Sequence, residues 1–176
     1  MKMILSDIDY YFDEYDAKID LVDNAVIPDE CIELTIHANN FNHNINFHDN
    51  IKIITFTFPF NYPIQNIKFP SQLEQLIFFR GLKNQKLNQT NINENCIIKL
   101  NWSYDEIVIN NLPNIKKLIL CDILMPLTNL PASLEYLEYT LINKNTTENF
   151  NNSKFPFGCH INQKYKVYET GEILIV

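Results

Sequence analysis

Apolar residues recur along this chain with a fixed internal spacing. An apolar residue is followed, after two variable positions, by a second one, and after one further variable position by a third. The six copies of this pattern are Cys31-Leu34-Ile36, Ile51-Ile54-Phe56, Leu73-Leu76-Phe78, a looser Asn95-Ile98-Leu100, Ile115-Leu118-Leu120 and Leu134-Leu137-Tyr139. Their middle residues are 20, 22, 22, 20 and 19 positions apart, a period that is typical of repeat solenoids.

The spacing inside each copy predicts a short strand. Alternate residues of a strand face the same side, so the middle and last apolar residues of a copy should point inward together. About six stacked turns of 19–22 residues would then form a mostly β solenoid, with a parallel sheet on the concave face and an irregular convex side that contains little helix. Each turn leaves its core open to its neighbours, so we expect caps at both ends.

Proline precedes four of the copies, at Pro28, Pro70, Pro113 and Pro131. Segments 70–76 and 131–137 are nearly superimposable, because they read Pro-Ser-Gln-Leu-Glu-Gln-Leu and Pro-Ala-Ser-Leu-Glu-Tyr-Leu. Proline fixes its own φ and pushes the preceding residue to an extended conformation. It should therefore end each return segment and set the direction of the next strand.

This pattern resembles leucine-rich repeats of the short type, and within that type it is most similar to the FNIP-repeat proteins, which are named for a Phe-Asn-x-Pro-Ile element. Segment 60–64 reads Phe-Asn-Tyr-Pro-Ile and matches the element fully, whereas segment 41–45, Phe-Asn-His-Asn-Ile, lacks the proline. The resemblance covers residues 28–142. The asparagine ladder of longer leucine-rich repeats is matched only at Asn39, so we expect a different packing on the convex side.

The repeats predict a single domain over residues 1–176. An acidic N-terminal cap occupies residues 1–27, the repeats residues 28–142, a polar loop residues 143–160 and a β-hairpin cap residues 161–176. The N-terminal cap contains two alternating runs, 2–5 and 18–22, that could pair or shield the first turn. In the C-terminal cap, two alternating runs flank a Glu-Thr-Gly turn.

The predicted strands also indicate which side chains line the concave face. Apolar residues are frequent there, and a contiguous exposed apolar patch usually marks an interaction site. The candidate binding residues are Ile53, Gln75, Ile77, Phe79, Ile97, Lys99, Lys117, Ile119 and Tyr136. The alternative is that an isoleucine-rich composition places β-branched residues on a sheet simply because they pack well side by side.

Charge and composition narrow the classes of partner. The net charge is −7, and ten acidic residues stand against Lys2 and Lys18 in residues 1–33. The remainder holds one arginine, Arg80, and no basic run, so we expect no nucleic acid partner. No segment has the apolar length that crosses a bilayer, and the four cysteines are far apart, so we expect a cytoplasmic protein with reduced thiols and no membrane contact.

Candidate chemistry is sparse. The acidic run that contains Asp7 and Asp9 has carboxylates of the kind that bind hard cations, but it lacks the spacing of an EF-hand loop. His37, His43 and His48 lack the glutamate of a zinc-binding helix, and no glycine-rich phosphate loop is present. We therefore expect no catalytic residues, no cofactor and no metal. A small metal-dependent enzyme or metal-binding protein that uses the acidic segment is the alternative.

The sequence thus predicts a non-catalytic protein–protein interaction module. Its concave face would bind a protein partner or a second copy of the chain. The resemblance implies a further alternative, because leucine-rich-repeat modules often supply substrate recognition to larger assemblies such as ubiquitin ligases. Residues 1–27 are too short and too acidic for the helical F-box that such an adaptor would carry.

Overall fold

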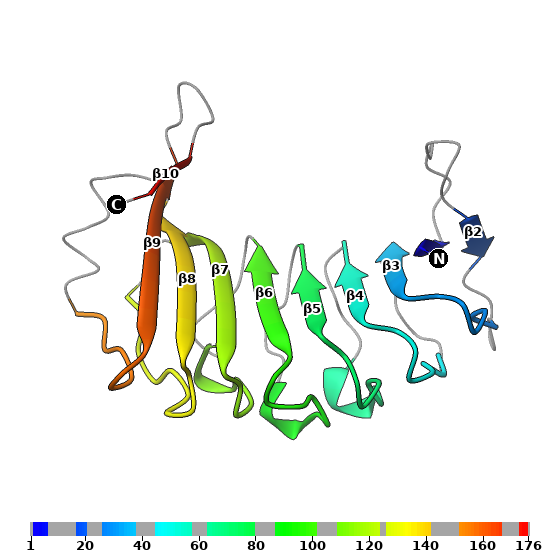
Figure 1. Cartoon of the computed structure of the whole chain (residues 1–176), viewed down its shortest axis with the longest axis horizontal. Helices are drawn as coiled ribbons and strands as arrows, with labels where there is room; N and C mark the ends of the chain where they lie inside the picture. Colours follow the sequence, from blue (N-terminus) through cyan, green and yellow to red (C-terminus); the bar gives the residue numbers. More distant parts are fainter. Residues whose placement is uncertain are drawn as a thin grey trace.

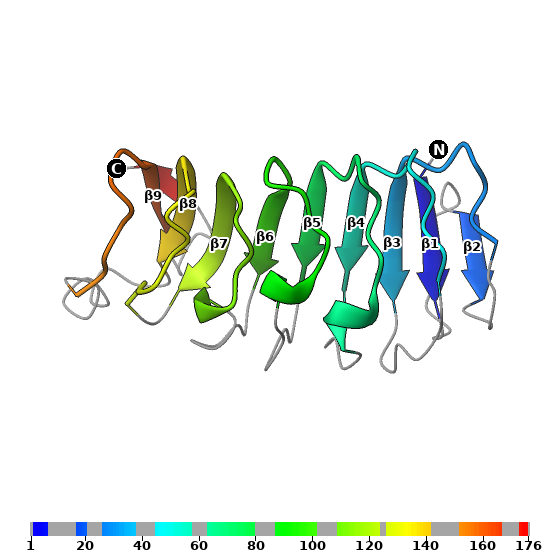
Figure 2. The same cartoon turned by 90° about the horizontal axis from the view of Figure 1, so that it is seen from below.

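The computed structural model describes residues 2–6, 17–20, 26–37, 45–57, 63–79, 87–101, 109–123, 126–141, 152–166 and 173–175. These residues form a ten-stranded sheet (Figure 1). The strands are β1 (Lys2–Ser6), β2 (Ala17–Asp20), β3 (Glu33–His37), β4 (Ile53–Phe56), β5 (Gln75–Phe78), β6 (Ile97–Asn101), β7 (Lys117–Ile123), β8 (Tyr136–Leu141), β9 (His160–Lys166) and β10 (Ile173–Ile175). Figure 2 shows strands β3 to β9 side by side in one row, with β1 and β2 beyond β3.

Strands β3 to β9 are parallel and each pairs with the next one along the chain. The middle apolar residues of the predicted copies are aligned in one row across the sheet: Leu34, Ile54, Leu76, Ile98, Leu118 and Leu137. The last apolar residues form a second row: Ile36, Phe56, Phe78, Leu100, Leu120 and Tyr139. The prediction of a mostly β repeat solenoid with a parallel sheet is confirmed.

The two rows form the core. Every one of these twelve side chains is at most 2% exposed, and the rings of Phe56 and Phe78 stack with centroids 5.2 Å apart. The return segments carry two short 3-10 helices among the described residues, η1 (Ile64–Asn66) and η2 (Leu87–Gln89), and each adds one fully buried residue to the core. Burying a large aliphatic side chain stabilises a fold by about 1.5–3 kcal/mol, so the core rows are the main source of stability.

The fourth copy differs from its prediction. Asn95 is exposed, and the fully buried residue is Cys96, whose backbone N–H donates a hydrogen bond to the carbonyl of Asn93 at 3.1 Å. Cys31 makes the same bond to Pro28 and Leu73 makes it to Pro70. The copy is therefore Cys96-Ile98-Leu100, because the one residue that separates the buried turn residue from the strand in the other copies is absent here.

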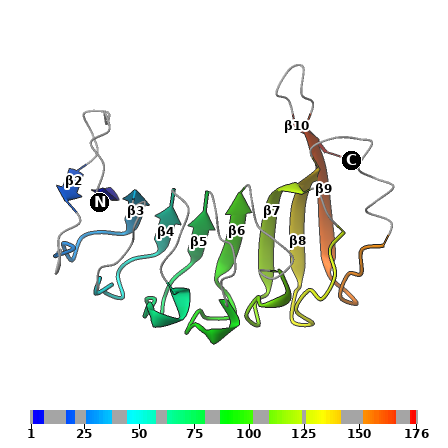
Figure 3. The same cartoon turned by 180° about the vertical axis from the view of Figure 1, so that it is seen from behind.

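The C-terminal part contains one more parallel strand than the sequence analysis predicted. We expected a polar loop through residue 160, but β9 begins at His160 and pairs in parallel with β8. The expected hairpin is present, because β10 pairs antiparallel with β9 and Leu174 lies opposite Tyr165. Figure 3 shows β9 and β10 at the opposite end of the sheet from β1 and β2. The hairpin thus extends the solenoid as well as ending it.

The N-terminal end is closed by β1 and β2. Strand β1 pairs in parallel with β3, and β2 pairs in parallel with the other edge of β1. Met3 lies beside Leu34 in the sheet and is fully buried, so β1 covers the core of the first turn. Both alternating runs of the predicted N-terminal cap therefore contain strands.

Polar side chains link neighbouring turns on the return side of the sheet. Asp49 accepts hydrogen bonds from the backbone N–H and hydroxyl of Ser71, both at 2.9 Å. The side chain of Asn91 accepts from the N–H of Phe69 at 2.9 Å and donates to its carbonyl at 2.7 Å. Each link joins residues 22 positions apart, which is one repeat. These bonds satisfy backbone groups that the sheet leaves unpaired. Asn39, the predicted remnant of an asparagine ladder, lies outside the described residues.

Within the described ranges, no helix has the length and apolar character needed to cross a membrane.

Leu118 and Ile119 test the assignment of the two faces, because they are neighbours on β7 that face opposite sides. Leu118 is fully buried, whereas Ile119 is half-buried on the other face. We expect Leu118→Ala to lower the free energy of unfolding by about 2–5 kcal/mol, because it leaves a cavity in the shared core. Ile119→Thr keeps the β-branch and should cost about 1 kcal/mol or less. Urea denaturation of both variants measures the difference, and the reverse ranking would show that the faces are inverted.

Candidate functional site

The face of the sheet that points away from the core is the candidate site, and we call it the open face. Its side chains alternate along each strand with those of the core rows. The first row of the open face is Glu33, Ile53, Gln75, Ile97, Lys117, Tyr136 and His160. The second row is Thr35, Thr55, Ile77, Lys99, Ile119, Glu138 and Asn162. Both rows are continuous across β3 to β9.

The structure places all nine candidate binding residues on this face or at its edge. Phe79 follows the last residue of β5 and is 49% exposed, and Lys117 is exposed as well. The other seven are half-buried by their neighbours: Ile53, Gln75, Ile77, Ile97, Lys99, Ile119 and Tyr136. Alternation along the strands also predicts a third row, two residues beyond the second. Asn101 and Thr140 belong to it and are buried, so this row is only partly accessible.

The apolar residues of the open face form a zigzag rather than a solid patch. In the first row, Gln75 lies between Ile53 and Ile97. In the second row, Lys99 lies between Ile77 and Ile119. Each isoleucine therefore has its nearest apolar neighbours on the diagonal, which is within the reach of long side chains. The central open face, which we define as the open face of β4 to β7, combines aliphatic surface with hydrogen-bonding and cationic groups.

A polar cluster closes the open face at its C-terminal end. The Lys164 ammonium lies 2.7 Å from a carboxylate oxygen of Glu138, and both side chains are about one-fifth exposed. The other carboxylate oxygen accepts hydrogen bonds from the Tyr136 hydroxyl and the Asn162 amide, each at 3.1 Å. The Tyr136 ring also stacks on His160, with the ring centroids 5.6 Å apart. These contacts hold five side chains of β8 and β9 in one network.

Sequence analysis missed this cluster, because three of its members come from β9, which was assigned to the polar loop and the cap. One signal could have found it. Cys159 and Ile161 repeat the spacing of Cys96 and Ile98, and both cysteine N–H groups donate to the carbonyl three positions earlier. The third position of this copy is Gln163, so the apolar pattern ends before the repeat does.

The Glu138 carboxyl is held in its charged form. Burial raises its pKa, but hydrogen bonds from Lys164, Tyr136 and Asn162, together with the charge of Lys164, outweigh burial and leave the pKa below its ordinary value. Such a group does not exchange protons near neutral pH. The cluster is therefore suited to fixing the end of the surface and to presenting hydrogen-bonding groups.

The cysteine thiols are poor nucleophiles. All four cysteines are free, as the sequence predicts. Burial raises the pKa of the Cys96 thiol to about 12, and it also raises the pKa of Cys31, Cys121 and Cys159. These thiols stay protonated at neutral pH, and the thiolate is the reactive form. The described residues contain no group of three or more potential metal ligands, and the acidic segment with Asp7 and Asp9 lies outside them.

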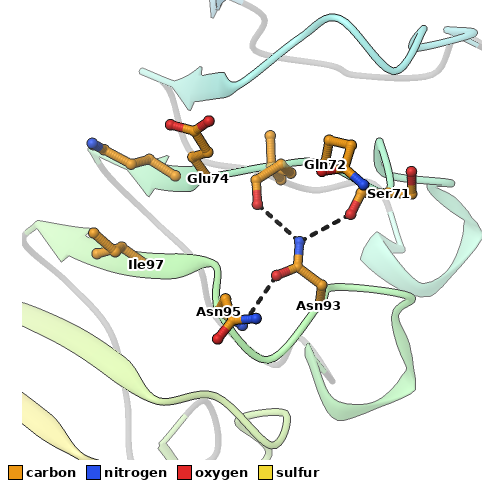
Figure 4. Close-up of a pocket in the computed structure, with 8 residues that line it drawn as sticks. Ser71, Gln72, Glu74, Asn93, Asn95 and Ile97 are labelled. Atoms are coloured by element: carbon orange, nitrogen blue, oxygen red, sulfur yellow. Dashed lines mark hydrogen bonds between the residues drawn. The ribbon is translucent and has the colours of Figure 1, made fainter.

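A hollow of about 380 Å³ lies beside the start of β5 and β6. Asn93 lies at its wall and donates hydrogen bonds to the carbonyls of Ser71 at 3.2 Å and Leu73 at 2.9 Å (Figure 4). Its side-chain oxygen Oδ1 accepts a hydrogen bond from the backbone N–H of Asn95 at 3.0 Å (Figure 4). The amide is thus engaged by the backbone of the preceding turn, so we assign Asn93 a structural role as a clamp between turns. A second hollow, of about 540 Å³, lies on the return side around Phe47 and Phe69.

Comparisons of the chain with models of protein families, with curated proteins and with solved structures found no match. What this chain does must therefore be inferred from its own surfaces.

Asn93→Ala tests the clamp. Removal of the side chain leaves two carbonyls without their shared donor, so we expect the free energy of unfolding to fall by about 1–3 kcal/mol. Asn95→Ala is the matched control, because its exposed side chain makes no hydrogen bond within the described residues, and it should change stability by less than about 0.5 kcal/mol. Thermal and urea unfolding measure both, and equal effects would show that the clamp is unimportant.

Glu138→Gln tests the polar cluster through pH. The pKa of Glu138 is lowered in the folded state, so its ion pair stabilises the fold above the ordinary carboxyl pKa and is lost as the pH falls through the folded-state pKa. We expect the variant to be less stable by about 1–2 kcal/mol at pH 7 and to approach the wild type only as the pH falls through the lowered folded-state pKa. Glu135→Gln, at an exposed carboxylate 3.9 Å from Lys116, should show little difference at either pH. A constant deficit for Glu138→Gln would contradict the ion-pair explanation.

Proposed function

We propose that this chain is a non-catalytic, cytoplasmic interaction module that binds a protein partner through the open face of its sheet. The observation that carries the proposal is the zigzag of half-buried isoleucines on β4 to β7, with the exposed ring of Phe79 at its edge. Exposed apolar surface of this kind, mixed with polar groups, is typical of a protein-binding site.

The rigidity of the sheet supports this proposal. The open-face side chains come from parallel strands with a continuous register, and the opposite side of every strand is packed into the core. A preorganised surface loses little conformational freedom when a partner binds. The residues that contact the partner in this proposal are Ile53, Gln75, Ile77, Phe79, Ile97, Lys99, Lys117, Ile119 and Tyr136.

The relation to leucine-rich repeats of the FNIP type is part of the same proposal. The repeat period supports it, and so does the role of the Pro-Ile half of the best-matching element. Pro63 precedes η1, and Ile64 begins it with its side chain fully buried in the core. The first three residues of that element, 60–62, lie outside the described residues.

The state of the reactive groups favours a binding role over a catalytic one. Glu138 is fixed in an ion pair with Lys164, and the pKa of every thiol is raised. A general base or nucleophile needs a pKa that suits proton exchange near neutral pH or a base beside it. The four free cysteines also agree with a reducing compartment.

A pair of variants tests the surface. Ile77→Asp with Ile119→Asp places two carboxylates in the second row of the open face, and we expect it to abolish partner capture from the source cell while the melting temperature changes little. Thr35→Asp is the control, because it adds one carboxylate to the same row at β3, outside the isoleucine zigzag. Light scattering on the same samples decides whether the partner is a second copy: a dimer that becomes a monomer only in the isoleucine variant identifies self-association. Partners and mass unchanged in that variant would refute the proposal.

A further inference from the structure

We propose that the partner segment is acidic and carries apolar side chains, and that Lys99 and Lys117 recognise its carboxylates. This inference rests on the proposed function, because it uses the same surface. It adds the chemical class of the partner: a protein segment with acidic residues between aliphatic or aromatic ones.

The charge of the central open face is opposite to that of the whole chain. The net charge of the protein is −7. On β4 to β7, however, the two rows of the open face hold Ile53, Thr55, Gln75, Ile77, Ile97, Lys99, Lys117 and Ile119, which include two lysines and no acidic residue. This part of the surface is therefore a small cationic area on an acidic protein. It attracts an acidic segment.

Lys99 and Lys117 have no ion-pair partner within the described residues, unlike the lysines around them. Lys116 lies 3.1 Å from a carboxylate oxygen of Glu94, and Lys164 lies 2.7 Å from one of Glu138. Lys52 lies at 3.9 Å from Glu74. These three lysines are each paired with a carboxylate, whereas within the described residues Lys99 and Lys117 are not.

The surroundings of the two lysines make a carboxylate a favourable partner. Lys99 is half-buried between Ile77 and Ile119 in its row. Aliphatic neighbours cover the stem of such a lysine and leave the ammonium at the surface. A partner segment that covers the isoleucines would exclude water from that ammonium, and an unpaired buried charge is costly. A carboxylate on the segment removes this cost.

The spacing of the lysines fits a single short segment. Lys117 is aligned with Ile97, two residues before Lys99 on β6, so the two lysines are diagonal neighbours on adjacent strands. Strand spacing and rise place their Cα atoms about 8 Å apart. Two acidic residues within one helical turn or one extended stretch can reach both. The apolar side chains between them would lie on the isoleucine zigzag.

A protein segment explains this surface better than a nucleic acid does. Phosphate backbones are bound by many lysines and arginines along a path, and the two rows of the central open face hold two lysines and no arginine. A nucleic acid would also leave the isoleucines without a function. Apolar and acidic groups on one segment use both features of the surface.

Selection of random peptides on the full chain tests the inference. Peptides enriched from a display library are synthesised with a fluorescent label, and their affinity is measured by anisotropy. We expect the enriched peptides to combine acidic and apolar residues, and Lys99→Glu with Lys117→Glu to weaken their binding at least about tenfold. Lys99→Gln with Lys117→Gln removes the charges without reversing them and should weaken binding less. Lys68→Glu with Lys154→Glu is the matched control, because it changes the net charge equally at two exposed sites and should alter affinity less than about twofold.

The outcomes separate this inference from the proposed function. Enriched peptides that are neutral or basic, or that bind the Lys99 and Lys117 variants as tightly as wild type, would overturn the acidic partner. If those peptides are still lost from Ile77→Asp with Ile119→Asp, the proposed function stands. If the peptides bind the Ile77→Asp, Ile119→Asp variant as tightly as they bind the wild type, both the acidic partner and the proposed function are overturned. The same holds if no peptide is enriched. Displacement of the acidic peptides by a labelled single-stranded oligonucleotide that itself binds more tightly would assign the surface to nucleic acid instead.

Discussion

Each turn of this chain places two apolar side chains on the inner side of a strand, and no turn can enclose them alone. Leu118 is fully buried because Ile98 and Leu137 lie beside it in the sheet, and each of these depends in turn on its next neighbour. A shift of one residue in any parallel pair would turn these side chains to the opposite face. The common register of β3 to β9 is therefore the constraint on which the rest of the structure depends. The open face exists as a defined surface only because the core rows fix which side chains remain for it.

The same constraint explains how far the sequence could predict the fold. A strand repeats its facing every two residues, so the pair Ile54 and Phe56 was enough to orient β4, and the neighbouring strands followed by the same rule. The prediction was wrong where the link between turn and strand changed length: Asn95 stands at the expected spacing, but a link one residue shorter puts Cys96 in the core. It was incomplete where the apolar pattern ended, because Gln163 occupies the third position of the copy on β9. Hydrophobic periodicity reports buried positions well and does not report the length of the links between them.

The candidate site was predictable to a similar degree. Alternation along the strands was sufficient to place Ile77 and Ile119 on the open face. The pairing of Glu138 with Lys164 was not predictable, because it depends on a strand that the polar pattern concealed. Likewise, the links between turns made by asparagine, such as the clamp at Asn93, could not be distinguished from the high asparagine content of the chain. A polar residue acquires its role from a partner about one repeat away, and a single sequence does not name that partner.

The position of β1 has a consequence for the integrity of the N-terminal end. Although β1 is first in the chain, it is not an edge strand, because it lies between β2 and β3. Strand β2 is held to the sheet through β1 and not through the strand that follows it in sequence. Loss of residues 2–6 would therefore remove an interior strand of the sheet. It would uncover the first turn of the core, and it would also detach β2, whose own residues the truncation leaves intact.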